Sequence, residues 1–80
     1  MRDRKVAIAF GQVLREARQE NGLSQEELAA DTDFDRTYPS LLERGLRTPT
    51  LTTLFEFADA LDLTPATLVN RTLERLGRSS

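Results

Sequence analysis

The sequence contains neither cysteine nor histidine among its 80 residues. Without cysteine, neither a disulfide framework nor a thiolate metal site can hold the fold. Without histidine, the chain lacks the usual general base and the most common metal ligand. A chain this short also offers little concave surface for a substrate pocket. We therefore expect no enzymatic activity, no cofactor and no metal site.

Long apolar runs are also missing from the sequence. The apolar run at residues 6–10 is too short for the core of a signal peptide, and no run approaches the length of a membrane span. We therefore expect a cytoplasmic location. A content of 39% hydrophobic and 30% charged residues suits one small domain. We expect this domain to span residues 1–80, with flexible ends at 1–4 and 77–80.

The net charge of −2 argues at first against a polyanionic partner, but the charges are unevenly distributed. Arg36, Arg44 and Arg47 stand close together in the sequence, after a stretch that is rich in Asp and Glu. An acidic protein can bind DNA through one local positive face, although its nonspecific affinity should be weak and sensitive to salt.

Helical spacing of apolar residues and typical helix-end residues predict an all-α fold with five helices. The first helix is expected over residues 5–20, where Asn21-Gly22 ends it. Ser24 and Glu27 form a capping box at the start of the second helix. The remaining helices are expected to begin after Asp35, Thr50 and Thr64.

Leu51, Leu54, Ala58 and Leu61 are spaced as the core-facing stripe of the fourth helix. At least one of two phenylalanines on that helix, at positions 55 and 57, should therefore point elsewhere. An exposed aromatic side chain beside the apolar fifth helix is typical of a self-association surface; the alternative is that the first helix covers it. The residues we expect at a homodimer interface are Phe55, Leu68, Thr72 and Leu76. The residues we expect in the core include Phe10, Leu28, Phe34, Leu42, Leu54 and Leu61.

Residues 23–45 are expected to form two short helices joined by a tight turn. The second of these helices begins with a polar face that carries an arginine. This pattern is typical of a helix-turn-helix, whose second helix lies in the major groove of DNA and presents its first residues to base edges.

The chain resembles the lambda-repressor-like (Cro and Xre type) helix-turn-helix family over roughly residues 10–69. The residues that carry the resemblance are Leu14, Arg15, Arg18, the run GLSQEELA at 22–29, Tyr38, the run ERG at 43–45 and the run RTPTL at 47–51. The resemblance implies a five-helix DNA-binding domain with the helix-turn-helix at helices 2 and 3. It also implies a sequence-specific transcriptional regulator. We expect this regulator to act as a homodimer, because one small module buries little DNA surface, and a two-fold dimer would bind a pseudo-palindromic operator. A phage-like repressor, an antitoxin and a restriction-modification controller all remain open as the subtype.

The same resemblance implies which residues contact DNA. Gln25 would reach a phosphate from the start of the second helix. Arg36 is the best candidate for reading a base, because its guanidinium can bond guanine O6 and N7 together. Arg44 and Arg47 would suit contacts to the DNA backbone. The full set of implied DNA-binding residues is Gln25, Asp35, Arg36, Thr37, Ser40, Arg44 and Arg47.

Three residues depart from the family pattern in the helix-turn-helix. Leu41 stands where the family commonly has a polar residue, and an exposed Leu there would meet DNA sugar or methyl groups, or a neighbour. Asp33 stands where the family often has Gly, and we expect Asp to tolerate the left-handed geometry of that turn. Pro39 would be the fourth residue of a helix capped by Asp35, where its missing N–H is first needed. It would either stiffen the start of this helix or shift the cap.

An alternative function is that of a protein-interaction module with this fold and weak or no DNA binding. Net acidity, Pro39 and Leu41 favour it. This alternative is favoured if acidic neighbours neutralise the three arginines. Examples are a pair between Arg44 and Glu43 or Glu16, or between Arg36 and an Asp. Gln25 would then be only a good helix former at an exposed position.

Overall fold

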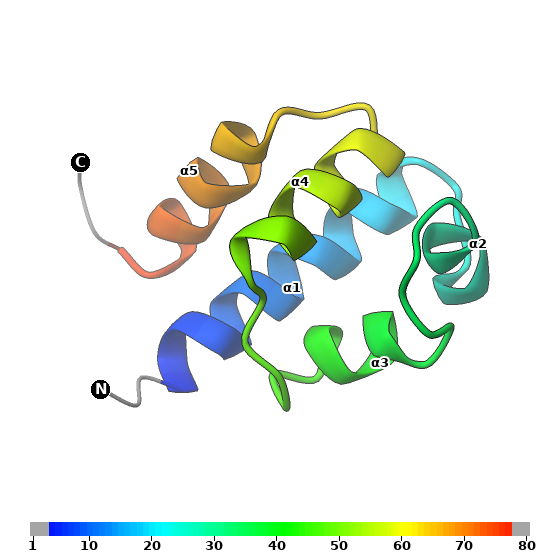
Figure 1. The fold of residues 1–80 in the computed structure, drawn as a ribbon. Helices are drawn as coiled ribbons and strands as arrows, with labels where there is room; N and C mark the ends of the chain where they lie inside the picture. The colour runs from blue at the N-terminus through cyan, green and yellow to red at the C-terminus, as the bar shows by residue number, and fades with distance from the viewer. Residues whose placement is uncertain (1–3, 78–80) are drawn as a thin grey trace.

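The computed structural model describes residues 4–77, which form five helices and no strand, so the all-α expectation is confirmed. The helices are α1 (Arg4–Glu20), α2 (Gln25–Ala30), α3 (Tyr38–Glu43), α4 (Leu51–Ala60) and α5 (Pro65–Arg75) (Figure 1). None of the helices in this range combines the length and apolarity that crossing a bilayer requires. Most of the residues expected to form flexible ends, 1–3 and 78–80, lie outside the described range.

The helix ends largely follow the signals in the sequence. The Ser24 hydroxyl accepts the Glu27 N–H at 3.0 Å and the Glu27 carboxylate accepts the Ser24 N–H at 2.8 Å, so the capping box is confirmed. Thr50 and Thr64 cap α4 and α5 in the same way, each accepting a backbone N–H at 3.1 Å. Gly22 ends α1 with a φ of 68°, the left-handed conformation that glycine adopts without strain.

The start of α3 differs from the expectation. Its N-cap is Thr37 and not Asp35, so the predicted cap is wrong. Pro39 explains the shift, because a helix beginning at Tyr38 places this proline at its second residue, where no intrahelical bond needs its N–H. The Asp35 carboxylate instead accepts the N–H and the hydroxyl of Thr37, both at 2.8 Å. Asp35 therefore stabilises the turn that leads into α3.

The turn between α2 and α3 does not use left-handed geometry at Asp33. Among the described residues, Asp62 is the only non-glycine with a positive φ, so this expectation is wrong. Thr32 shapes the turn instead. Its hydroxyl donates to the Ala29 carbonyl at 2.7 Å and accepts the Phe34 N–H at 3.1 Å. A local side-chain to backbone bond thus reverses the chain without backbone strain.

The core lies between α1 and the other helices. α1 packs against both α3 and α5, which lie on different sides of it in Figure 1. Of the six expected core residues, Phe34 and Leu54 are only partly buried against the core and the other four are buried. The buried cluster consists of Phe10, Val13, Leu14, Ala17, Leu28, Leu42, Phe57, Ala58, Leu61 and Leu68.

The buried face of α4 is rotated from the predicted stripe. Leu51 is 70% exposed, whereas Phe57 is fully buried, so the expectation for Leu51 is wrong. The ring of Phe57 packs against Phe34 and Tyr38, with centroid separations of 5.3 and 6.2 Å. Both partners lie outside α4. Burying the large apolar ring of Phe57 against them stabilises the fold more than burying Leu51 at the start of α4 would.

α1 and α3 approach so closely at Gly11 that their backbones are in contact. A Cβ atom at this position would lie 2.3 Å from the Leu42 carbonyl oxygen and 2.7 Å from that of Glu43. Only glycine fits there, because both neighbours are backbone atoms that cannot rotate away. Gly11 therefore sets how deeply the second helix of the helix-turn-helix sits on α1.

We expect Gly11→Ala to destabilise the fold by about 3 kcal/mol, since either α1 or α3 must shift to relieve the overlap. Urea denaturation followed by circular dichroism measures this loss. Gly22→Ala is the matched control: its Cβ would meet nothing within 4 Å, and only the positive φ should cost about 1 kcal/mol. Equal losses in the two variants would contradict the close-packing argument.

Candidate nucleic-acid interface

A shallow groove of about 470 Å³ lies between the start of α2 and α3. It brings together five of the seven residues that we expected to contact DNA. Asp35 and Arg47 do not line it; Arg47 lies in the connector before α4. The residues that line the groove are Gln25, Glu26, Arg36, Thr37, Ser40, Leu41 and Arg44.

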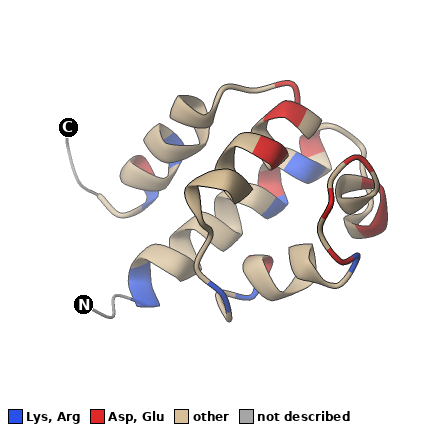
Figure 2. Cartoon of the chain, in the orientation of Figure 1, with Lys and Arg blue, Asp and Glu red and all other residues tan. Residues whose placement is uncertain are grey.

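Arg36, Arg44 and Arg47 are exposed, and none of them forms an ion pair or side-chain hydrogen bond with another residue in the range 4–77. The alternative partners of Arg44 are occupied, because Glu43 pairs with Arg18 and Glu16 pairs with Arg75. Figure 2 shows that basic residues flank α3 on both sides, whereas acidic residues lie on α2 and the turn after it, and also on α4. The three arginines therefore keep their charge and donors available to a ligand.

Glu43 at the end of α3 is turned into the protein. Its side chain is 4% exposed and accepts from Arg18 Nε at 2.7 Å and from Arg18 Nη2 at 3.1 Å. The hydrogen bond to Glu43 raises the pKa of Arg18 despite partial burial of the guanidinium. Arg18 also donates to the Leu23 carbonyl at 2.8 Å. This arrangement removes the Glu43 carboxylate from the surface on which Arg44 lies.

The Asp35 carboxylate is also used locally. The two bonds from Thr37 lower the pKa of Asp35, and the charge of Arg36 contributes least to that shift. Asp35 therefore remains ionised where it accepts the two bonds from Thr37, and it forms no ion pair with Arg36. Neither Asp35 nor Glu43 neutralises the arginines in the way that would favour a protein-interaction module.

The sequence did not identify two features of the groove. The first is Glu26, which lines the groove beside Gln25. Its position in the first turn of α2, next to Gln25, is the sequence feature that could have predicted this. The Gln25 side chain donates from Nε2 to Glu43 Oε1 at 3.0 Å, across 18 positions of sequence. No local pattern indicates that bond. Within residues 4–77, no three His, Cys, Asp or Glu side chains gather in a way that would hold a metal ion.

The residues expected at a dimer interface are only partly at the surface. Phe55 is 58% exposed, so α1 does not cover it. Leu68 is fully buried, and the buried Thr72 donates its hydroxyl to the Leu68 carbonyl at 2.8 Å. Both side chains are buried in the core of the chain itself and expose little area to a second copy. Leu76 is half-buried at an apolar groove lined by α1, α4, α5 and the connector before α4.

The groove, the flanking arginines and the short helix pair define a helix-turn-helix DNA-binding domain, and comparison with known proteins identifies its family. The helix-turn-helix family model matches residues 14–68. The HTH-type transcriptional regulator y4dJ of Sinorhizobium fredii is 49% identical over 57 residues, which are 71% of this chain and 74% of that protein. The chain belongs to the helix-turn-helix family, a class of DNA-binding transcription regulators and not of enzymes.

Two solved structures of restriction-modification controller proteins are similar to this chain. C.AhdI from Aeromonas hydrophila is 45% identical, with a TM-score of 0.74, over 78% of this chain and 94% of that one. C.Esp1396I, solved as a tetramer in complex with its natural 35 base-pair operator, is 26% identical with a TM-score of 0.80. That match covers 91% of this chain and 96% of that chain. The resemblance to lambda-repressor-like regulators is thereby confirmed.

We expect Ser24→Ala to destabilise the fold by about 1 kcal/mol at pH 7, because the capping box at the start of α2 loses the hydroxyl that accepts the Glu27 N–H. Bonds from Ser24 lower the pKa of Glu27. The stabilisation from this carboxylate is therefore present at neutral pH and is lost as the pH falls through the lowered pKa. Denaturation measures the loss. An NMR titration should show that the pKa of Glu27 rises only in part, because the backbone N–H of residue 24, the larger cause of the lowered pKa, remains in the variant. Ser24→Thr keeps the hydroxyl and should stay near wild type; a similar loss in both variants would contradict the capping role.

Proposed function

We propose that this chain is a sequence-specific transcriptional regulator that binds a pseudo-palindromic operator as a homodimer, with α3 in the major groove. The observation that carries the proposal is the groove between α2 and α3, in which Arg36 and Arg44 lie beside hydroxyl and amide side chains and form no ion pair within residues 4–77. Arginine, hydroxyl and amide groups are those that bond DNA phosphates and base edges. A regulator with this role would act in the cytoplasm.

The positions of the side chains suggest a division of roles. Arg36 lies in the turn just before α3, where a recognition helix meets base edges, and we assign it to a guanine. Thr37 and Ser40 face the same groove and suit a base or a phosphate. Arg44 and Arg47 follow α3 and suit phosphates that fix the register of the protein on the duplex.

Among the subtypes, the comparisons favour a controller of the restriction-modification type. C.AhdI shares nearly half of the aligned residues with this chain, and the match spans nearly all of that protein. C.Esp1396I binds its operator as a tetramer. We infer that this chain likewise places more than one copy on its operator, because one small module buries little DNA surface.

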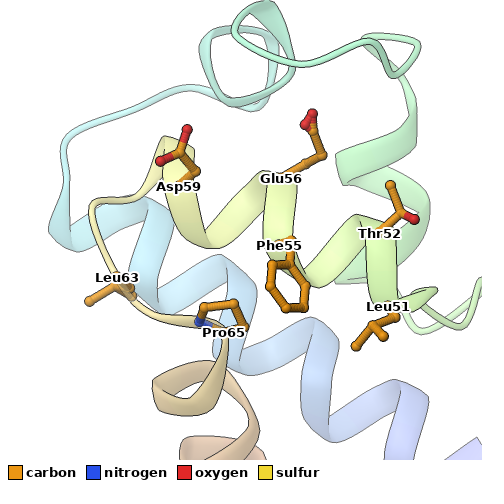
Figure 3. A pocket seen from close by; sticks show the side chains of 7 residues that line it. All are labelled: Leu51, Thr52, Phe55, Glu56, Asp59, Leu63 and Pro65. Carbon is orange, nitrogen blue, oxygen red and sulfur yellow. The ribbon is translucent and has the colours of Figure 1, made fainter.

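The proposed dimer surface is revised to the exposed apolar residues of α4 and α5. Leu51, Phe55 and Val69 are large apolar side chains that remain 43–70% exposed. Leu51 and Phe55 line one side of a hollow that also contains Leu63 and Pro65, while Glu56 and Asp59 project along its other side (Figure 3). An apolar patch with a polar rim is typical of a protein-protein contact. A two-fold dimer then predicts operator half-sites about one helical turn apart.

We expect selection from a randomised duplex pool to enrich a two-fold symmetric site with wild-type protein. Arg36→Ala should weaken binding to that site by about 1–3 kcal/mol and relax the preference at one base pair of each half-site. Arg47→Ala should instead weaken binding to all sequences alike and reduce the salt slope by about 1. Affinities measured at two salt concentrations distinguish the two effects.

Arg71→Ala is the matched control for this experiment, since it removes the same charge from α5, which does not line the groove. Its operator preference should equal that of wild type. Failure of wild-type protein to enrich any site, or an Arg36→Ala variant that selects the same site as strongly, would overturn the proposed function.

We expect Phe55→Glu to weaken self-association by about 2 kcal/mol, roughly 30-fold in the dimer dissociation constant, because it places a charge in the apolar patch. Sedimentation equilibrium measures this constant. The fold itself should be nearly unaffected, because Phe55 is already exposed. Leu46→Glu changes another exposed apolar residue outside the patch and should leave the constant unchanged. A dimer insensitive to Phe55→Glu would exclude this surface.

A further inference from the structure

The side chain of Gln25 is held in place from inside the protein. Its Nε2 donates to Glu43 Oε1 at 3.0 Å, and a carboxylate can only accept hydrogen bonds. The bond therefore fixes which end of the amide faces Glu43. The second N–H of Nε2 and the carbonyl Oε1 of Gln25 remain for a partner in the groove that Gln25 lines.

Glu43 is itself immobilised by its other contacts. Arg18, which lies on α1, donates to both oxygens of the Glu43 carboxylate, at 2.7 and 3.1 Å. It also donates to the Leu23 carbonyl, just before α2. One buried carboxylate thus connects three helices: α1 through Arg18, α3 through its own backbone, and α2 through Gln25. Because the Glu43 carboxylate is bonded to both Arg18 and Gln25, its side chain has few alternative rotamers.

We propose that Glu43 is a positioning residue for DNA binding, which holds the Gln25 amide so that its second N–H can donate to a DNA phosphate. The inference rests on the proposed function. Glu43 does not touch DNA in this arrangement, since it is buried and lies behind Gln25. Its contribution is to order the amide before DNA arrives, so that binding pays less side-chain entropy.

A double-mutant cycle on operator affinity tests this dependence. Gln25→Ala should weaken binding of the otherwise wild-type chain about 5- to 10-fold, the loss of one hydrogen bond. Glu43→Asp keeps the charge that Arg18 requires but is one methylene shorter and should not reach both partners. In the Glu43→Asp background, Gln25→Ala should therefore change affinity less than about twofold. An equal effect of Gln25→Ala in both backgrounds would mean that Glu43 does not act through Gln25, and would overturn the inference.

A measurement on the wild-type chain covers the case in which Glu43→Asp fails to fold. We expect NMR relaxation and hydrogen exchange to show a rigid and protected side-chain amide at Gln25 in the absence of DNA. Gln19 is the control, because its exposed amide makes no hydrogen bond within residues 4–77. If Gln25 is as mobile as Gln19 while the protein binds its operator, only this inference fails. If the wild-type chain binds no duplex, the proposed function fails together with it, whatever the state of the amide.

Discussion

The buried ion pair between Arg18 and Glu43 fixes α3 against α1, and the proposed DNA-binding surface depends on that orientation. Glu43 is 4% and Arg18 12% exposed at the side chain. Removing one partner of such a pair typically costs about 3–5 kcal/mol, since the other charge stays buried without compensation. The backbone contact at Gly11 acts on the same end of α3, where it meets Leu42 and Glu43. One constraint is electrostatic and the other steric, and together they leave α3 little freedom to slide or turn.

The same internal bonds explain how an acidic chain presents arginines that form no ion pair with any residue in the range 4–77. Asp35 and Glu43 are the sequence neighbours of Arg36 and Arg44, and each carboxylate is committed elsewhere. The surface beside α3 is therefore locally positive although the chain carries a net charge of −2. Binding through so few basic residues should be weak on nonspecific DNA, so that selectivity depends on the contacts made in the groove.

Local chemistry made the helix ends and the helix-turn-helix predictable from the sequence. Ser24, Thr50 and Thr64 cap helices because a short hydroxyl at this position can accept a backbone N–H of the first turn that has no partner within the helix. The errors arose where distant residues decide. Leu51 fits the helical stripe of α4, but the site beside Phe34 and Tyr38 takes Phe57 instead.

Pairing between helices was equally hidden from the sequence. Leu68 and Thr72 look like a surface stripe until α5 packs against α1. Five of the groove residues could be predicted from the family pattern. The Gln25–Glu43 bond could not, because nothing within four residues of either side chain signals it.

If DNA binds in the groove between α2 and α3, the backbone amides that line this groove should respond to DNA more than any others. Titration of isotope-labelled protein with its selected operator duplex, followed by backbone amide NMR shifts, measures this response. We expect the largest shifts at Gln25, at the non-proline residues of 36–40 and at Arg44, with small changes along the exposed side of α4. Shifts concentrated on α4 around Phe55, with the groove residues unmoved, would instead assign DNA binding to the exposed surface of α4.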